Sequence, residues 1–249
     1  MNAKYEVKEV TNMQYIFKRL EKKYLITQNQ AAQLKSTLAQ HMKPDGFGTR
    51  PVQNLYCDTT NWDIIRTSIE KPYYKEKMRL RCYGIPSSSD LIFLELKKKY
   101  AGIVYKRRIT VPLQTLLYRG LKDYLAGQTT QIARELNFHV QSKNVSEKMF
   151  VSYHRTAFIG IEDEDLRITL DSKICYRLNM LDFFHPGEGR HILPEDHVLM
   201  EIKTSKGVPM WLAKSLSDNK IYTSSFSKYG ACYTDYYQRK IQKEVIISA

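Results

Sequence analysis

Lysine or arginine occupies every second position of one short run, Lys75-Glu76-Lys77-Met78-Arg79-Leu80-Arg81-Cys82. Successive side chains of a β-strand point to opposite faces of its sheet. The four cations therefore share one face, and Met78, Leu80 and Cys82 share the other. The run predicts a strand that packs its apolar face into a core and presents a row of positive charge on its second face.

The same alternation recurs in four further runs: Leu20–Tyr24, Leu91–Lys98, Arg167–Asp171 and Val198–Lys203. One such strand is typical of an ordinary antiparallel sheet with a solvated face, and that interpretation stays open. If the strands form one sheet that curls into a barrel, one of the two faces lines the interior. Glu21, Glu95 and Glu201 each precede a lysine by two residues, so this face offers carboxylates beside its cations.

A dry interior full of cations would cost several kcal/mol per ion, so a charged interior has to be wet and to hold a polyanion. Phosphates need cationic partners, whereas a divalent metal needs oxygen ligands. One lining of this kind supplies both.

The composition supports an anionic partner, because the formal net charge is +13 over 249 residues. Nucleic acid, an acidic membrane surface, and a phosphorylated molecule or polymer all meet this condition. The hydrophobic fraction of 43% is enough for a packed core, and the length fits one domain over residues 1–249. Neither a transmembrane run nor a signal peptide is visible, so we expect a cytoplasmic protein.

The four cysteines and six histidines show no metal-binding spacing. We expect Cys57, Cys82, Cys175 and Cys232 to be reduced structural thiols.

Periodicity and turn residues predict about eight strands with two helical interludes in an α+β domain. Strands are expected over residues 15–26, 52–57, 74–83, 91–99, 102–111, 148–158, 166–171, 174–178 and 198–204. Helices are expected over 29–42, with Thr27 as its N-cap, over 112–126, and over 132–138.

The order of eight short motifs resembles a known family, the VTC domain, from about residue 15 to 235. The motifs are Glu21-Lys22-Lys23-Tyr24, Met78-Arg79-Leu80-Arg81-Cys82-Tyr83-Gly84, Phe93-Leu94-Glu95-Leu96-Lys97, Tyr105-Lys106-Arg107-Arg108, Tyr153-His154-Arg155-Thr156-Ala157-Phe158, Arg167-Ile168-Thr169-Leu170-Asp171, Met200-Glu201-Ile202-Lys203 and Phe226-Ser227-Lys228-Tyr229. The VTC domain is the catalytic domain of the vacuolar transporter chaperone complex, a polyphosphate polymerase in the CYTH-like superfamily of triphosphate tunnel metalloenzymes.

This resemblance implies an eight-stranded antiparallel β tunnel barrel with a charged interior and helices packed outside. It assigns phosphate binding to Lys23, Arg79, Arg81, Lys97, Lys106, Arg108, Arg155, Lys203 and Lys228. All of these except Lys106 and Arg108 are also expected to be catalytic. Glu201 matches the family's ligand for manganese (Mn²⁺) or magnesium (Mg²⁺), and Glu21 and Glu95 are further candidates.

The first strand departs from the E-x-E-x-K pattern of the wider superfamily, because it reads Arg19-Leu20-Glu21-Lys22-Lys23. The missing carboxylate makes a two-carboxylate metal cluster for water activation harder to build. This departure favours phosphoryl transfer over hydrolysis.

The expected reaction is transfer of the γ-phosphoryl group of ATP to a growing inorganic polyphosphate. A hydrolase of inorganic or organic triphosphates, an adenylyl cyclase, and a polyanion-binding module without catalysis are the alternatives. A nucleic-acid partner is not expected, because Glu21, Glu95 and Glu201 would repel a phosphate backbone unless a metal intervened.

Several single residues have a simpler structural explanation. Lys106 and Arg108 would then form a solvated sheet edge, Arg155 would pair with Asp171, and Lys228 would cap a helix. Tyr83 and Tyr105 are interpreted as packing residues rather than as nucleotide-stacking ones.

Overall fold

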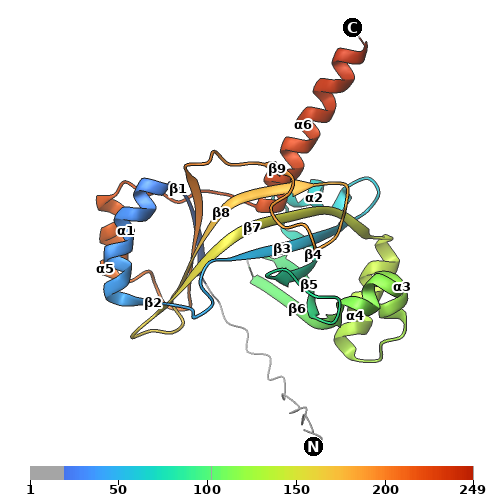
Figure 1. Cartoon of the computed structure of the whole chain (residues 1–249), viewed down its shortest axis with the longest axis horizontal. Coiled ribbons are helices and arrows are strands. Elements are labelled where there is room, and N and C mark those ends of the chain that lie inside the picture. The colour runs from blue at the N-terminus through green and yellow to red at the C-terminus, as the bar shows by residue number, and fades with distance from the viewer. Residues whose placement is uncertain (1–19, 102, 249) are drawn as a thin grey trace, which may run out of the picture.

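The computed structural model describes residues 20–101 and 103–248, in which one antiparallel sheet of ten strands is accompanied by six helices (Figure 1). Eight strands follow one another across the sheet in the order β1 (Leu20–Thr27), β10 (His197–Thr204), β8 (Arg167–Arg177), β7 (Ser146–Gly160), β3 (Arg50–Asp58), β4 (Tyr74–Tyr83), β5 (Leu91–Tyr100) and β6 (Ile103–Pro112). The short strands β2 (Met42–Pro44) and β9 (Arg190–His191) pair with β7 and β8.

The helices lie at separate places around this sheet. They are α1 (Gln28–His41), α2 (Asp63–Ile69), α3 (Leu113–Ala126), α4 (Gln131–Lys143), α5 (Met210–Asp218) and α6 (Lys228–Ser248). In Figure 1, α1 and α5 lie together beside one end of the sheet, α3 and α4 lie at the other end, and α6 extends away from it.

The alternation in β4 sets the two faces of the sheet. Met78, Leu80 and Cys82 are buried in an apolar cluster that contains leucines of α3 and α4. A second apolar cluster joins the outer sides of β1, β8 and β10 to α1 and α5. Arg79 and Arg81 alternate with these apolar residues, so the charged rows lie on the opposite, inner face.

A third apolar cluster lies on the inner face itself. It packs α2 and the first turns of α6 against Tyr56 of β3 and Tyr153 of β7. The phenol hydroxyl of Tyr56 accepts a hydrogen bond from Arg79, and that of Tyr153 accepts one from Arg81. This packing brings the first residue of α6, Lys228, to the charged face.

The prediction of a closed eight-stranded barrel is not confirmed, because the sheet is open. No backbone pairing joins β1 to β6 within residues 20–101 and 103–248. Side chains and a loop connect the two sides instead. A carboxylate oxygen of Glu21 on β1 lies 3.6 Å from Lys97 Nζ on β5, and Ser224 N–H donates to the Lys23 carbonyl at 2.7 Å. Lys77 Nζ on β4 donates to Ser227 Oγ at 2.7 Å. The segment 224–227 therefore bridges strands that do not pair with each other.

Most predicted strands are confirmed with small changes at their ends. Residues 15–19 of the first strand, which include Arg19, and residue 102 lie outside the described residues. The two strands predicted over 166–171 and 174–178 are one continuous strand, β8. A register shift between Ser152 and His154 of β7 lets β8 continue through Ser172 and Lys173, the latter with φ of 52°.

The helix predictions are confirmed where local signals were present. Thr27 caps α1 in a reciprocal arrangement with Gln30, and α3 matches its predicted range. Helix α4 is longer than predicted and ends at Asn144, whose backbone is left-handed. Helices α2, α5 and α6 and strands β2 and β9 were not predicted.

The four cysteines are buried and free, as expected. Among the helices that the structure describes, none combines the length and apolar character needed to cross a membrane.

Candidate active site

Three cations converge on one buried carboxylate near the middle of the inner face. Glu95 of β5 is 2% exposed and accepts hydrogen bonds from Arg79 of β4 at 2.7 and 2.9 Å. Arg108 of β6 donates to the other Glu95 oxygen at 2.6 Å, and Lys106 Nζ lies 2.7 Å from it. We call these four residues the Glu95 cluster. Cross-strand register explains the meeting, because Glu95 pairs with Arg79 on one side and with Arg108 on the other.

The carboxyl group of Glu95 is held in its ionised state. Burial alone would raise the pKa of the Glu95 carboxyl, but Arg79, Arg81 and Lys106 bring it far below its ordinary value. Lys106 and Arg108 keep 46% and 36% of their side chains exposed while they contact a carboxylate that is almost inaccessible. They are therefore oriented by a fixed anion, which a merely solvated sheet edge would not provide.

A second cluster forms around Asp171 of β8 and Glu201 of β10. Arg155 of β7 donates to both Asp171 oxygens at 2.7 Å, the ion pair considered from the sequence. Lys228 Nζ lies 2.6 Å from Asp171 and 3.0 Å from Glu201, and Lys203 Nζ lies 3.4 Å from Glu201. We call these five residues the Glu201 cluster.

The Glu201 cluster is buried at its centre. Asp171 is fully buried, and Glu201 and Lys228 are nearly so. Burial raises the pKa of Glu201, yet Lys228, Lys203 and Lys23 bring it well below its ordinary value. The pKa of Lys228 is raised because Asp171 and Glu201 outweigh the effect of its burial. Glu201 and Lys228 are therefore both charged at neutral pH.

Glu21 connects two further predicted cations, Lys23 and Lys97, to this cluster. Lys23 Nζ lies 3.5 Å from Glu21 and 3.7 Å from Glu201, and Lys97 Nζ lies 3.6 Å from the second Glu21 oxygen. Because β1 pairs with β10 so that Glu21 faces Lys203 and Lys23 faces Glu201, the two carboxylates lie diagonally across neighbouring strands.

Arg81 lies between the clusters and has a different environment. It is 7% exposed and donates to Asn54 Oδ1 at 2.9 Å and to the Tyr153 hydroxyl at 3.3 Å. The Tyr153 ring also contacts Lys228, whose Nζ lies 4.6 Å from the ring centre. The structure thus brings all nine predicted phosphate-binding residues to one face of the sheet.

A cavity of about 820 Å³ opens at one end of this face. Its walls include Glu21, Lys23 and Lys97, together with hydroxyl residues of the loop 223–227. Lys77 also lines it, and burial together with the neighbouring Lys23 and Lys75 lowers the pKa of Lys77 to about 7. A concave surface of this size with convergent charged groups is suited to a small anionic ligand.

The carboxylates differ in their fitness for Mn²⁺ or Mg²⁺. Glu95 already accepts bonds from two arginines and contacts a lysine, so it does not fit a metal ligand. Glu201 also contacts three lysines, but their rotatable ammonium groups impose less geometry than the arginine forks on Glu95. Glu21 and Glu201, which share Lys23, therefore fit a cation that takes one or two carboxylates and completes its shell with phosphate oxygens and water. Within the described residues no group of three or more metal-ligating side chains forms a complete site.

Some residues of the site were not assigned from the sequence. Asn54, Tyr56 and Tyr153 hold Arg79 and Arg81, and their positions depend on pairing of β3 and β7 with distant strands. Lys77 could have been assigned to the site from the sequence, because it shares the alternating face of β4 with Arg79.

The tyrosines interpreted as packing residues occupy different surroundings. Tyr83 packs edge to face with Phe93 and beneath Arg50, whereas Tyr105 alternates with Lys106 and belongs to the outer face.

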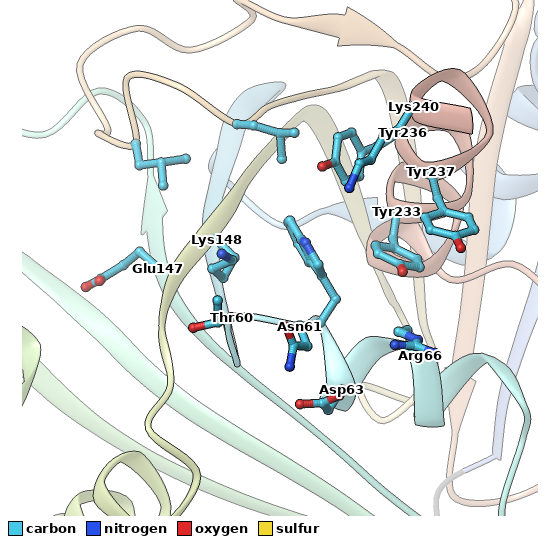
Figure 2. Close-up of a pocket in the computed structure, with 13 residues that line it drawn as sticks. Thr60, Asn61, Asp63, Arg66, Glu147, Lys148, Tyr233, Tyr236, Tyr237 and Lys240 are labelled. Atoms are coloured by element: carbon cyan, nitrogen blue, oxygen red, sulfur yellow. The ribbon is translucent and has the colours of Figure 1, made fainter. Parts of the chain in front are cut away.

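A second cavity, of about 660 Å³, lies beside α2 and α6 (Figure 2). Aromatic side chains of α6, among them Tyr233 and Tyr236, meet Trp62 there. Its lining shares no residue with the Glu95 or Glu201 cluster.

The sequence was compared with models of protein families and with curated proteins. The model of the VTC domain family matches residues 18–237. None of the curated proteins matches the chain.

Solved structures similar to the chain include three at low identity and with TM-scores below 0.5. A candidate adenylate cyclase from Vibrio parahaemolyticus is 13% identical, with 86% of this chain and 96% of that chain covered and a TM-score of 0.45. A protein from Pyrococcus horikoshii is 12% identical, with 81% and 86% covered and a TM-score of 0.40. The Mediator head module of Schizosaccharomyces pombe has a chain that is 10% identical, with 81% and 90% covered and a TM-score of 0.42.

The family match covers every strand of the sheet path and every residue of both clusters. The chain therefore belongs to the VTC domain family.

Proposed function

We propose that this protein is a polyphosphate polymerase, which transfers the γ-phosphoryl group of ATP to the end of an inorganic polyphosphate. The observation that carries the proposal is the convergence of cations from β1, β4, β5, β6, β7, β10 and α6 on one concave face. Family membership supports it. We also propose that the strands and helices act as one catalytic domain.

In the proposed reaction a terminal oxygen of the polyphosphate forms a bond to the γ-phosphorus. The bond from that phosphorus to the β,γ-bridging oxygen breaks, and ADP leaves with the electron pair. The acceptor oxygen is already anionic, so no strong base is needed. Phosphoryl transfer of this kind depends on positioning and on charge stabilisation.

The two clusters suit this task because their cations are already oriented. Arg155 is fixed by a bidentate contact with Asp171, Arg79 by two hydrogen bonds to one Glu95 oxygen, and Arg81 by Asn54. Arginine can present two parallel N–H groups to phosphate oxygens, and lysine adds a compact point charge. Groups that are ordered before substrate arrives require less reorganisation during the reaction.

Glu201 and Glu21 would hold Mn²⁺ or Mg²⁺ beside the phosphates. When bound, such a metal would neutralise charge on phosphate oxygens. The side chains of this chain would align the triphosphate and keep the acceptor in line with it. We further propose that the open sheet acts as a tunnel, whose remaining side is formed by the segment 224–227.

The test is incubation of the purified protein with γ-labelled ATP and Mn²⁺, followed by gel separation of the products. We expect a metal-dependent ladder of polyphosphate that Arg81→Ala and Glu201→Ala abolish. Arg108→Ala should also reduce it strongly. The matched control is Arg107→Ala, because Arg107 is the next residue on β6 and pairs with Glu135 on the outer face.

The products distinguish the alternatives. Orthophosphate without a ladder would contradict a polymerase and would indicate a triphosphate hydrolase. Cyclic AMP would indicate a cyclase. Binding of triphosphate without turnover of any kind would leave a polyanion-binding module.

A further inference from the structure

Lysines gather at one end of the charged face, around the 820 Å³ cavity. Besides Lys22 and Lys23 of β1 and Lys97 of β5, this cavity is lined by Lys71, Lys75, Lys77 and Lys99. We call these last four residues the lysine mouth. None of them belongs to the set assigned to phosphate binding above, although Lys75, Lys77 and Lys99 continue the rows of β4 and β5 that contain Arg79 and Lys97.

The lysine mouth differs from the centre of the site in how its charge is balanced. The cations of the Glu95 and Glu201 clusters each contact a carboxylate. In contrast, Lys71, Lys75 and Lys99 form no ion pair within the part of the chain that the structure describes, and Lys77 has only the Ser227 hydroxyl. The carboxylate of Glu76, another residue of the wall, is already bonded to Tyr74 and Lys143.

Neighbouring lysines of the mouth repel the charge of Lys75, which lies on β4 among them. Burial and the neighbouring Lys99 and Lys71 lower the pKa of Lys75. Two carboxylates, Glu21 and Glu76, line the same concave surface, but Glu21 already pairs with Lys97 and Glu76 with Lys143. The close cations of the lysine mouth therefore lack counter-charge of their own. A bound anion would supply that charge.

The type of cation indicates the type of anion. The centre contains four arginines, Arg79, Arg81, Arg108 and Arg155, whose planar forks favour a fixed bidentate geometry. The mouth contains only lysines, whose flexible stems and rotatable ammonium groups impose no single geometry. Hydroxyl residues of the same wall, Ser224, Ser225 and Ser227, add neutral hydrogen-bonding groups. This combination suits a linear polyanion whose repeating units shift in position.

We propose that the lysine mouth is a second anion subsite, which binds the phosphate residues of a chain that extends beyond those held by the Glu95 and Glu201 clusters. This inference rests on the proposed function for the identity of the chain. The subsite predicts that the protein binds long phosphate chains more tightly than short ones. This difference in affinity can be measured without turnover.

The experiment compares the binding of inorganic triphosphate and of long-chain sodium polyphosphate by calorimetry at several salt concentrations. The variant is the triple substitution Lys71→Gln, Lys75→Gln and Lys99→Gln. We expect its affinity for triphosphate to stay within about twofold, whereas its affinity for the long chain falls about tenfold, or ~1.4 kcal/mol. The salt dependence of long-chain binding should become shallower, because fewer counterions are released.

The matched control removes the same formal charge elsewhere, with Lys35→Gln, Lys43→Gln and Lys214→Gln, all exposed outside the cavity. It should leave both affinities nearly unchanged. Because the triple substitution removes repulsion, its melting temperature should not fall. Single substitutions at Lys75 and Lys99 provide a second measurement if the triple variant does not fold.

Two results would overturn the subsite. An equal loss of affinity for both ligands would show that the lysine mouth contributes only a general electrostatic attraction. Unchanged affinity for the long chain would show that the mouth does not contact it. The two proposals can fail separately. If the wild-type protein makes no polyphosphate from ATP but the triple variant still loses long-chain affinity, the polymerase proposal fails and the subsite stands.

Discussion

Glu95 is the residue whose replacement has the most direct consequence for the fold, because three cations depend on it. Glu95→Gln keeps the size of the side chain but leaves Arg79, Lys106 and Arg108 without their common counter-charge. We expect the free energy of unfolding to fall by roughly 3 kcal/mol or more, as when one partner of a buried pair is removed. Urea unfolding of the two proteins measures this change in the free energy of unfolding.

The control for this prediction is Glu164→Gln. Glu164 is 78% exposed and pairs with the exposed Lys43. Its loss should cost less than about 1 kcal/mol. A similar small effect for Glu95→Gln would contradict the role given to the Glu95 cluster.

Lys77 gives a pH-dependent prediction. Its folded pKa is about 7, below its ordinary value of 10.5, because of burial and of the nearby cations Lys23, Lys75, Lys97 and Arg79. Between pH 7 and 10.5 the unfolded chain binds more protons at this residue, so its contribution to stability rises with pH. Below pH 7 both states are protonated, and the full repulsion opposes folding.

We therefore expect Lys77→Met to stabilise the protein most at or below pH 7, with a gain that fades as the pH approaches 10.5. Urea unfolding at neutral and alkaline pH measures this gain. Lys35→Met, on the exposed side of α1, should change the free energy of unfolding by less than about 0.5 kcal/mol at either pH. A gain that is constant with pH would show that Lys77 does not titrate in this range.

At the scale of single residues the sequence predicted the cations better than their partners. Arg79 and Lys97 follow from alternation within one strand, which is a local property. The contacts of Arg81 with Asn54 and Tyr153 depend on the register of β3, β4 and β7, and local periodicity does not specify which strands pair.

Helix α6 extends away from the sheet, and its first residues lie beside the candidate active site (Figure 1). Tyr229, its second residue, donates to the fully buried Asp58 at 2.9 Å and stacks on Tyr56 with ring centres 4.2 Å apart. Asp58 also accepts the backbone N–H groups of Ile64 and Ile65 at the start of α2. One carboxylate thus joins α2 to α6 beside Lys228.

We expect Tyr229→Phe to lower the free energy of unfolding by about 1.5 kcal/mol or more, because a buried carboxylate loses a donor. Turnover should also fall, since Lys228 precedes this residue. Thermal or urea unfolding and the polyphosphate assay measure the two effects. Tyr233→Phe is the matched control, because its hydroxyl makes no hydrogen bond within the described residues and its ring packs near Trp62 (Figure 2). Equal effects of the two substitutions would contradict the role of Asp58.

The predictability of the elements follows the range of the forces that form them. Thr27 and Gln30 cap α1 through contacts three residues apart, and this helix was predicted. The seven-residue α2 has no side-chain cap bond at its N-cap residue, Trp62, whose φ is 63°, and it depends on Asp58 and on packing against α6. Short helices that depend on tertiary contacts leave little local signal.

The open sheet is a property of the whole molecule that no single strand revealed. Alternation predicted a common interior, but whether β1 and β6 pair depends on the curvature of all the strands between them. The segment 224–227 contains no strand, and its contacts with Lys23 and Lys77 involve residues far apart in the chain.

The bridge between the two sides of the sheet predicts a response to ligand. The Ser224 amide donates to the Lys23 carbonyl across this gap. Because phosphate would contact cations on both sides, we expect saturating triphosphate to slow hydrogen exchange of this amide by at least about tenfold. Exchange of the Asp45 amide, which directly follows β2 and donates to the Ala157 carbonyl of β7, should stay unchanged. Equal protection of both would indicate global stabilisation instead.

The paired carboxylates of the inner face also determine how strongly it can hold its ligand. In the free protein Glu95, Asp171 and Glu201 act as internal counterions for the cations around them. A phosphate chain would therefore not meet unpaired cations at the centre of the face. It would compete with these carboxylates for the same lysines and arginines. The net free energy of binding is then a small difference between two sets of contacts. If the ligand is a phosphate chain, as proposed, the face would work as an ion exchanger, which retains a highly charged polymer and still lets it move on.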